Sequence, residues 1–132
     1  MMTKSPSGAL SPYYYKGGYF HGIHYGSYFD DMEALLSMME KEEAFILNSP
    51  QKRRILMDFY ETDLSKSVLI KVVQHIERLN PRIIKLAIAS DKKSLWNLRK
   101  AIKKANMPGK AQFYFCTDME DGKTWLVNDG SH

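Results

Sequence analysis

Three acidic side chains, Asp58, Glu61 and Asp63, lie at or just beyond the end of the apolar run "RRILMDF" in the middle of the chain. If that run is a parallel strand, these acids lie at its carboxyl end, where open α/β sheets bind ligands. An enzyme that used Asp58 and Glu61 would need a deep cleft and a raised carboxyl pKa. The same acids are also candidates for contact with a partner. For Asp63 we favour a simpler role, as the cap of the helix that follows.

The two histidines of "HGIH" suggest a metal site, but their spacing opposes it. His21 and His24 are three residues apart on a predicted strand, so their side chains point to opposite faces of the sheet. We therefore expect half-buried strand histidines and no metal. Cys116 ends another apolar run, with no second cysteine or histidine beside it, and we expect a buried, unreactive thiol.

The stretch from Lys92 to Lys110 carries seven basic residues, no acid and one tryptophan, Trp96. At 100° per residue its leucines and alanines fall on one arc of a helix and its basic residues on the other, with Trp96 among them. A large aromatic on a basic face is typical of a contact surface. The candidate contact residues are Trp96, Lys93, Arg99, Lys100 and Lys103. The alternative is an indole that packs over the lysine stems.

Three kinds of partner suit the basic helix 92–104. An acidic protein would be steered by the lysines and anchored by the tryptophan. Nucleic acid would use the lysines for phosphates and the indole for stacking, and an anionic membrane would take up the indole. A net charge of +4 is a weak signal for nucleic acid, so we expect a protein partner. The acidic stretch 30–43 also permits self-association of unlike patches, including a homodimer.

The tyrosines cluster near the start of the chain, in "PYYYKGGYFHGIHYGSYF". Strands favour aromatic residues, so packing in the core and along edges is the default interpretation. The alternative is an apolar pocket, for which Tyr15, Tyr19 and Tyr25 are the candidate lining residues.

The elements that position these residues follow from periodicity and breakers. The aromatic segment predicts one or two strands with a hairpin about Lys16–Gly18. An amphipathic helix follows, capped by Asp30 or Asp31, with Met32, Leu35, Leu36, Met39, Ile46 and Leu47 on one face. From there strands and helices alternate: strand 53–59, helix 64–79, strand 82–90, the basic helix, strand 111–116 and a terminal helix within 117–127. Such alternation predicts parallel strands in an α/β sandwich with a mixed sheet.

Composition places the chain in the globular class, because 44% of its 132 residues are hydrophobic and 26% are charged. We expect a short flexible leader over residues 1–11, which lacks the apolar core of a signal peptide, and one domain over 12–132. A single cysteine excludes an internal disulfide and suits the cytoplasm. No apolar run approaches the roughly 18 residues that a membrane span needs.

The segment "RRILMDFYETDLSKSVLIKVVQHI" resembles the central part of STAS domains, the anti-anti-sigma-factor fold. The following "RIIKLAIASDKKSLWNLRKAIKKAN" and the closing "MEDGKTWL" resemble later units of that fold. The chain looks most like the bacterial STAS/SEC14-like branch, whose members often end in a helix finishing with "WL". The likeness covers about Arg53 to Val127. It implies a four- or five-stranded sheet flanked by helices, without catalysis and without a cofactor.

The resemblance also implies a switch. Regulatory STAS domains bind a partner protein and are controlled by phosphorylation of a serine in a motif close to Asp-Ser-Ser-Gly. The matching positions here are Asp63, Leu64, Ser65 and Lys66, so a leucine holds the usual phosphoacceptor position. Ser65 and Ser67 are the candidate phosphoacceptors, at a helix start where a phosphate is favourable.

The sequence thus predicts a non-enzymatic regulatory or protein-binding module of STAS type. The alternative is a carrier of a small apolar ligand or lipid, as in SEC14-like proteins, which would need a sizeable apolar cavity. Binding of an anionic surface or nucleic acid through helix 92–104 ranks below both.

Overall fold

The protein is built on a five-stranded mixed sheet. The computed structural model describes residues 3–8 and 10–128. Along the sheet the strands are β3 (Tyr13–Tyr15), β4 (Gly18–His24), β5 (Arg53–Asp58), β6 (Ile83–Ala89) and β7 (Gln112–Cys116). The first pair is antiparallel and the other three are parallel. The predicted α/β class with a mixed sheet is confirmed.

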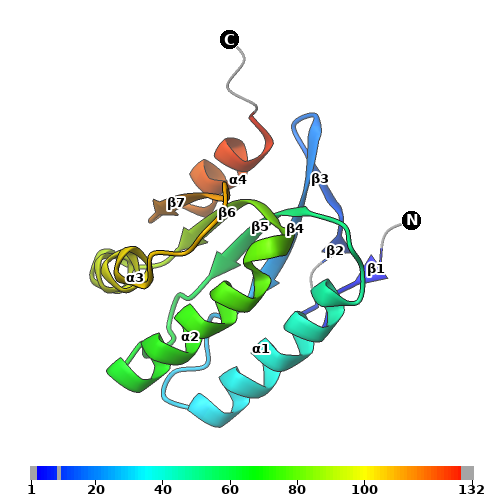
Figure 1. Ribbon diagram of the computed structural model, residues 1–132. Coiled ribbons are helices and arrows are strands. Elements are labelled where there is room, and N and C mark those ends of the chain that lie inside the picture. Colours follow the sequence, from blue (N-terminus) through cyan, green and yellow to red (C-terminus); the bar gives the residue numbers. More distant parts are fainter. Residues whose placement is uncertain (1–2, 9, 129–132) are drawn as a thin grey trace.

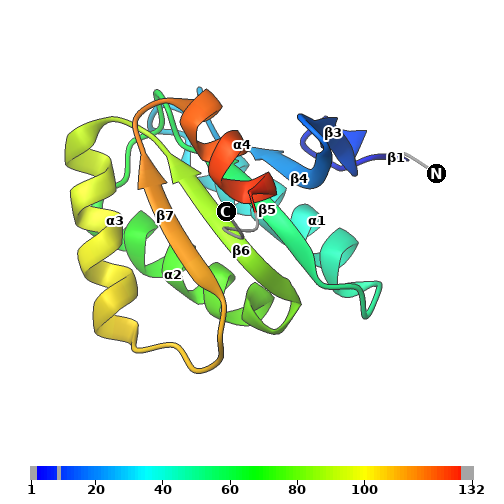
Figure 2. The same cartoon turned by 90° about the horizontal axis from the view of Figure 1, so that it is seen from above.

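Helices cover both faces of this sheet (Figure 1). The crossovers between parallel strands are α1 (Met32–Leu47), α2 (Lys66–Leu79) and α3 (Lys92–Ala105). Because each parallel strand pairs with the next one in the chain and crossovers share one hand, these three helices lie on the same face. The last helix, α4 (Met119–Val127), lies on the other face, and Figure 2 shows it running over the strands.

The hairpin between β3 and β4 turns where the sequence predicts it. Lys16 and Gly17 both have positive φ, 44° and 91°, as a two-residue turn between twisted strands requires. The next helix, α1, is capped by Asp31, whose carboxylate accepts a hydrogen bond from the Ala34 amide. The predicted hairpin turn and the predicted cap of α1 are therefore both confirmed.

The start of α2 differs from the prediction. Its first residue is Lys66 and its cap is Ser65, so the expected capping role of Asp63 is wrong. The reason lies in the preceding loop. The Asp63 amide donates to the carbonyl of Phe29 at 2.7 Å, and Thr62 forms a β-bridge with Phe29. This pairing keeps the chain extended through residue 63, which delays the helix.

The predicted apolar face of α1 is right in its middle and wrong at its ends. Leu35, Met39 and Ile46 are buried, whereas Met32 and Leu47 are exposed. The helix has 16 residues and spans about 24 Å, while the six residues of β5 below it span about 20 Å. Met32 and Leu47 are the first and last residues of the helix, beyond the length of β5.

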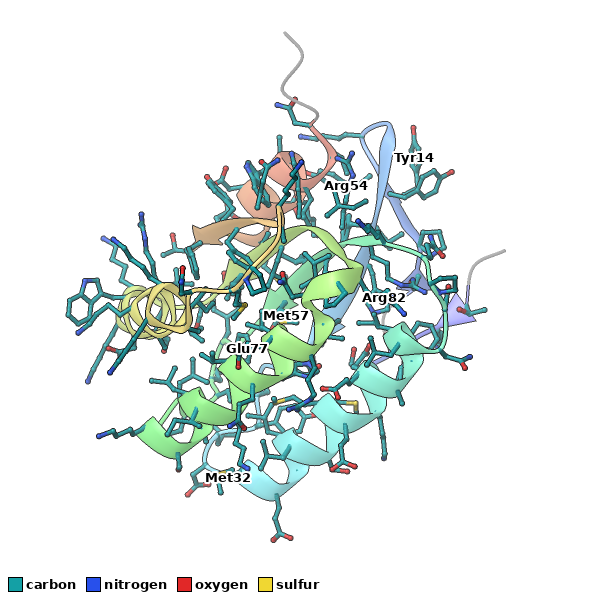
Figure 3. The ribbon with its side chains drawn as sticks, viewed as in Figure 1. Tyr14, Met32, Arg54, Met57, Glu77 and Arg82 are labelled. Carbon is teal, nitrogen blue, oxygen red and sulfur yellow. The ribbon has the colours of Figure 1, made fainter. Side chains whose placement is uncertain are left out.

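Strand alternation divides the interior into two parts. The larger core lies under α1, α2 and α3, and includes the fully buried Met57, which Figure 3 shows between the sheet and α2. The smaller one, under α4, consists of Phe20, Leu56, Ala87 and Leu126. Arg54 points to this second side, where its guanidinium donates to the Leu126 carbonyl at 2.6 Å (Figure 3).

Part of the segment expected to be a flexible leader has regular structure. Strands β1 (Thr3–Lys4) and β2 (Leu10–Ser11) pair in antiparallel fashion beside the main sheet, and Ser5 and Ser11 are buried. Residues 1, 2 and 9 lie outside the described part of the chain. Within residues 3–8 and 10–128, no helix combines the length and the apolar character that crossing a bilayer requires.

Candidate functional site

The carboxyl end of β5 brings Asp58 against a histidine from the neighbouring strand. His24 Nδ1 lies 2.9 Å from Asp58 Oδ2 and 3.1 Å from Oδ1. The Asp58 side chain is 10% exposed and the His24 side chain 57% exposed. Because an ionised carboxylate only accepts hydrogen bonds, Nδ1 carries the proton, and in the neutral imidazole Nε2 then holds the lone pair. The exposed imidazole can therefore accept a hydrogen bond from a ligand through Nε2.

His24 and Asp58 line an open groove of about 370 Å³ between the β3–β4 hairpin and α4. Its floor is apolar, with Phe20, Leu56 and Met119, and Gly22 leaves room above the sheet. This volume is in the range of small-molecule sites. The groove lies at the sheet end where parallel α/β folds bind ligands.

Glu61 and Asp63 do not join Asp58 in this groove. The Glu61 carboxylate accepts a hydrogen bond from the Ser27 hydroxyl at 3.0 Å, and Asp63 is exposed. The Ser27 and Phe29 amides donate to the carbonyls of Tyr60 and Glu61, at 2.7 and 2.8 Å. The loop after β5 is thus tied to the loop after β4, and its acids point to different partners.

The candidate phosphoacceptors lie at the start of α2. The Ser65 hydroxyl caps the helix by accepting from the Val68 amide at 3.4 Å, and it lies 3.3 Å from the Ser67 hydroxyl. Both residues are exposed, which gives a modifying enzyme access to them. A phosphate on Ser65 would lie where the first amides of the helix favour negative charge.

The basic helix has the two faces that its sequence predicts. Leu95, Leu98 and Ile102 are buried, while Trp96 is 60% exposed. The Lys100 ammonium lies 4.0 Å from the centre of the indole ring, a cation–π contact. The side chains Lys92, Lys93, Arg99, Lys100, Lys103 and Lys104 are all exposed. Figure 3 shows side chains of α3 pointing away from the rest of the molecule.

A groove of about 450 Å³ runs between α2 and α3, next to this basic face. Its lining is largely aliphatic, with Leu69, Ile70, Val73, Ala101 and Ala105. The polar residues that also line it are Lys66, Lys104, Gln74 and Glu77. Ile70 is exposed. An apolar groove lined on both sides by lysines fits an amphipathic segment that carries acids.

The three tyrosines proposed for one pocket are not brought together. Tyr25 is fully buried in the larger core, Tyr15 lies by α4 with its hydroxyl on Glu120, and Tyr19 is exposed near the hairpin. Tyr19 and Tyr25 are six residues apart along one extended segment, about 20 Å. A common pocket of these tyrosines is therefore wrong.

The two histidines of "HGIH" do point to opposite faces, but neither is half-buried: His24 is exposed and His21 is buried. His21 Nε2 lies 3.1 Å from Glu42 Oε1, so it donates, and in the neutral imidazole Nδ1 accepts from the Ser11 hydroxyl at 2.5 Å. Burial raises the pKa of Glu42, but hydrogen bonds from His21, Ser7 and Ser5 hold it below its usual value.

The order Ser11–His21–Glu42 is also that of a hydrolase triad. Here, however, Ser11 is 3% exposed, and its oxygen already accepts a hydrogen bond from Arg53 Nη1 at 2.9 Å. The network therefore holds the N-terminal strands against α1 instead of offering a nucleophile. Cys116 is likewise buried, and burial raises the pKa of its thiol to about 11.

A second buried network was not foreseen. The Tyr25 hydroxyl lies 2.8 Å from His75 Nε2, His75 Nδ1 lies 2.9 Å from Glu43 Oε1, and Arg78 Nε lies 2.8 Å from Glu43 Oε2. Because Glu43 only accepts, Nδ1 is the donor and Nε2 accepts from the tyrosine. This chain of bonds joins the residue that follows β4 to α2 and α1. No local pattern in the sequence signals it, because Tyr25 and His75 are 50 residues apart.

No family model matches this chain, and no match is found among curated proteins or solved structures. Among the described residues, no group of three or more histidine, cysteine, aspartate and glutamate side chains is arranged to hold a metal ion.

Proposed function

We propose that this chain is a non-enzymatic protein-binding module of STAS type, and that it binds an acidic protein through the exposed face of α3 and the adjoining groove. The observation that carries the proposal is Trp96, which is 60% exposed among lysines. Exposing the large apolar surface of an indole to water is unfavourable, and tryptophan is among the residues most often found as anchors of interfaces.

Charge gives the class of partner. Exposed basic side chains surround Trp96 on α3, and Lys66 of α2 faces the same groove. An acidic partner would be attracted over about 8–10 Å at physiological salt. Its aliphatic residues would fill the groove between Ile70 and Ala101. The STAS part of the proposal is supported by the strand order, with each parallel strand beside the next and three crossover helices on one face.

The phosphoacceptor role of Ser65 or Ser67 belongs to the same proposal. Both serines are exposed at the start of α2, and Lys66 lies between them and lines the groove. A phosphate there would add negative charge close to a surface that recruits acids. We therefore expect phosphorylation to weaken the binding of the acidic partner.

The test uses a photo-crosslinking amino acid at position 93, on the basic face of α3. The control carries it at position 33, an exposed residue of α1. A protein captured from position 93 and not from 33 is purified and titrated against wild type and variants. We expect Trp96→Ala to weaken binding of the partner by more than tenfold. Lys103→Glu should also weaken it, and the difference from wild type should grow as the salt concentration is lowered. Lys41→Glu, on the α1 side, is the matched charge control and should change little.

Two results would contradict the proposal. One is a purified partner whose affinity is the same for wild type and Trp96→Ala. The other is tight binding of a single-stranded oligonucleotide that depends on Trp96 and falls steeply with salt, which would assign the face to nucleic acid.

The groove at His24 favours a second candidate, a carrier of a small ligand. Its apolar floor and its volume of about 370 Å³ suit a small amphipathic molecule, whose polar group would meet the His24–Asp58 pair. Native mass spectrometry of the purified protein tests this, with Gly22→Leu to fill the groove. A small molecule that is bound to the wild type and absent from Gly22→Leu supports the carrier. A ligand-free wild-type spectrum, together with equal binding of an apolar fluorescent dye by wild type and Gly22→Leu, opposes it.

A further inference from the structure

The amino end of β5 carries a small polar pocket that none of the sites above uses. It measures about 140 Å³ and opens beside the loop that joins α1 to β5. Its polar lining comes from three stretches of the chain, namely Ser11, His21 and the consecutive Gln51, Lys52, Arg53 and Arg54. Three of these residues are cations, and none of the residues lining the pocket is an acid.

Arg53 is the unusual member of this lining. Its Nη1 donates to the Ser11 hydroxyl at 2.9 Å, and its guanidinium carbon lies 5.6 Å from the centre of the Phe45 ring. Its Nε, by contrast, is buried and has no hydrogen-bond partner within the part of the chain that is described. A buried donor left unpaired costs about 1–3 kcal/mol. Such groups call for an explanation, of which an ion or a water is one.

The charges around Arg53 are also unbalanced. Glu42 is the neighbouring carboxylate, but its two oxygens accept from His21 and from the Ser7 amide. Burial lowers the pKa of the Arg53 guanidinium, and Glu42 offsets this only in part. Lys52 adds positive charge to the same pocket, whereas the guanidinium of Arg54 is engaged on the other face of the sheet by the Leu126 carbonyl. An anion would relieve this excess and supply an acceptor to the arginine fork.

We propose that this pocket is a binding site for a phosphate-type oxyanion, held by Arg53 together with Lys52. The volume sets the size of the ligand, because about 140 Å³ is well below the 300 Å³ or more of pockets for drug-sized molecules. It is room for one tetrahedral oxyanion, either free inorganic phosphate or the phosphate group of a larger molecule whose remainder stays outside. Tyr19 and Pro12 line the pocket as well.

His21 takes part by holding Ser11 in place. Its Nε2 is committed to Glu42 and its Nδ1 to Ser11, so it fixes the Ser11 oxygen as the acceptor for Arg53 Nη1. Ser11 is thereby a positioning residue, which orients the guanidinium and leaves its other donors for the anion. The site is at the opposite end of the parallel strands from the His24–Asp58 groove, since Arg53 begins β5 and Asp58 ends it.

The experiment titrates the full chain with inorganic phosphate and, separately, with phenyl phosphate, at constant ionic strength set by chloride. Calorimetry gives the dissociation constant, and the ¹H–¹⁵N signal of Arg53 Nε reports the site directly in the wild type. We expect saturable binding of one phosphate and a downfield shift of the Arg53 Hε proton as it gains an acceptor. Tighter binding of phenyl phosphate would identify the phosphate group of a larger molecule as the ligand, and tighter binding of inorganic phosphate the free ion.

Two variants and a matched control complete the test. Arg53→Lys keeps the charge but loses the fork, and should weaken phosphate binding about tenfold or more. Lys52→Ala changes an exposed residue at the rim, should leave the fold intact, and should weaken binding several-fold. Arg78→Lys makes the same chemical change on α2 and should leave the dissociation constant for phosphate unchanged. Absence of saturable binding, an unmoved Arg53 Nε signal, or equal affinity in wild type and Lys52→Ala would each overturn the proposal.

Discussion

The Tyr25–His75 hydrogen bond offers a direct test of how the sheet is fastened to α1 and α2. Tyr25 and His75 are both fully buried, and the bond between them is 2.8 Å. In Tyr25→Phe the ring remains and the hydroxyl is lost. His75 Nε2 is then a buried acceptor without a donor, because Nδ1 is held by Glu43.

The expected cost follows from that single unpaired atom. Leaving a buried acceptor unsatisfied costs about 1–3 kcal/mol of unfolding free energy. His75→Leu should cost a similar amount, because it leaves the Tyr25 hydroxyl unpaired. In the double variant both partners are apolar, so its cost should be smaller than the sum of the two by about 1–3 kcal/mol.

Urea denaturation at pH 7.5, followed by circular dichroism, measures all four proteins. Tyr14→Phe is the matched control, since the Tyr14 side chain is 59% exposed on the hairpin (Figure 3). It should change the unfolding free energy by less than about 0.5 kcal/mol. A cost for Tyr25→Phe as small as that of the control would refute the reasoning, and so would strict additivity in the double variant.

Three further predictions concern other parts of the molecule. Burial holds the pKa of His75 below its usual value although Glu43 opposes this, so the unfolded chain takes up the proton first as pH falls. The free energy of unfolding should be highest above about pH 6.5 and fall below it by up to about 1.4 kcal/mol per pH unit. Urea midpoints measured between pH 7.5 and 5.5 should decline less in His75→Gln than in the wild type. Ser65→Ala should cost about 1 kcal/mol through the lost cap whereas Ser65→Asp should not, and equal urea midpoints for the two would contradict the capping role. A Cβ at Gly122 would lie 2.9 Å from Cys116 Sγ, so Gly122→Ala should destabilise by about 1–3 kcal/mol in thermal melts, and an unchanged melting temperature would speak against such close packing of α4.

Trp96 also has a spectroscopic prediction. Iodide is an anion, so at low salt it should quench an exposed indole among lysines with high efficiency. The other tryptophan, Trp125, is half-buried and stacks on Tyr114 with 5.0 Å between the ring centres. The iodide-quenched fraction should therefore disappear in Trp96→Phe, and its persistence would show that Trp125 is the accessible ring.

The sequence alone determined the parts of this protein that depend on neighbours in the chain. The alternation of strands and helices from Arg53 onward and the opposite orientations of His21 and His24 follow from periods of 2.0 and 3.6 residues and from helix-breaking residues. The turn at Lys16 and Gly17 follows from the glycines between two aromatic runs. These periods are local, because they reflect backbone geometry over a few residues. The same reasoning placed Trp96 on the basic face of its helix and Leu98 on the apolar face, and Leu98 is buried.

The tertiary structure alone decided which distant side chains meet. His24 reaches Asp58 across 34 residues, Arg53 reaches Ser11 across 42, and Tyr25 reaches His75 across 50. Such pairs depend on strand register and on how the helices lie over the sheet, which no local period encodes. Asp63 shows the same limit in reverse: its residue type suits a helix cap, but the pairing of its loop with Phe29 moved the helix start to Lys66. The residues of each candidate site come from distant parts of the chain, so only the packing of the sheet and its helices brings them together.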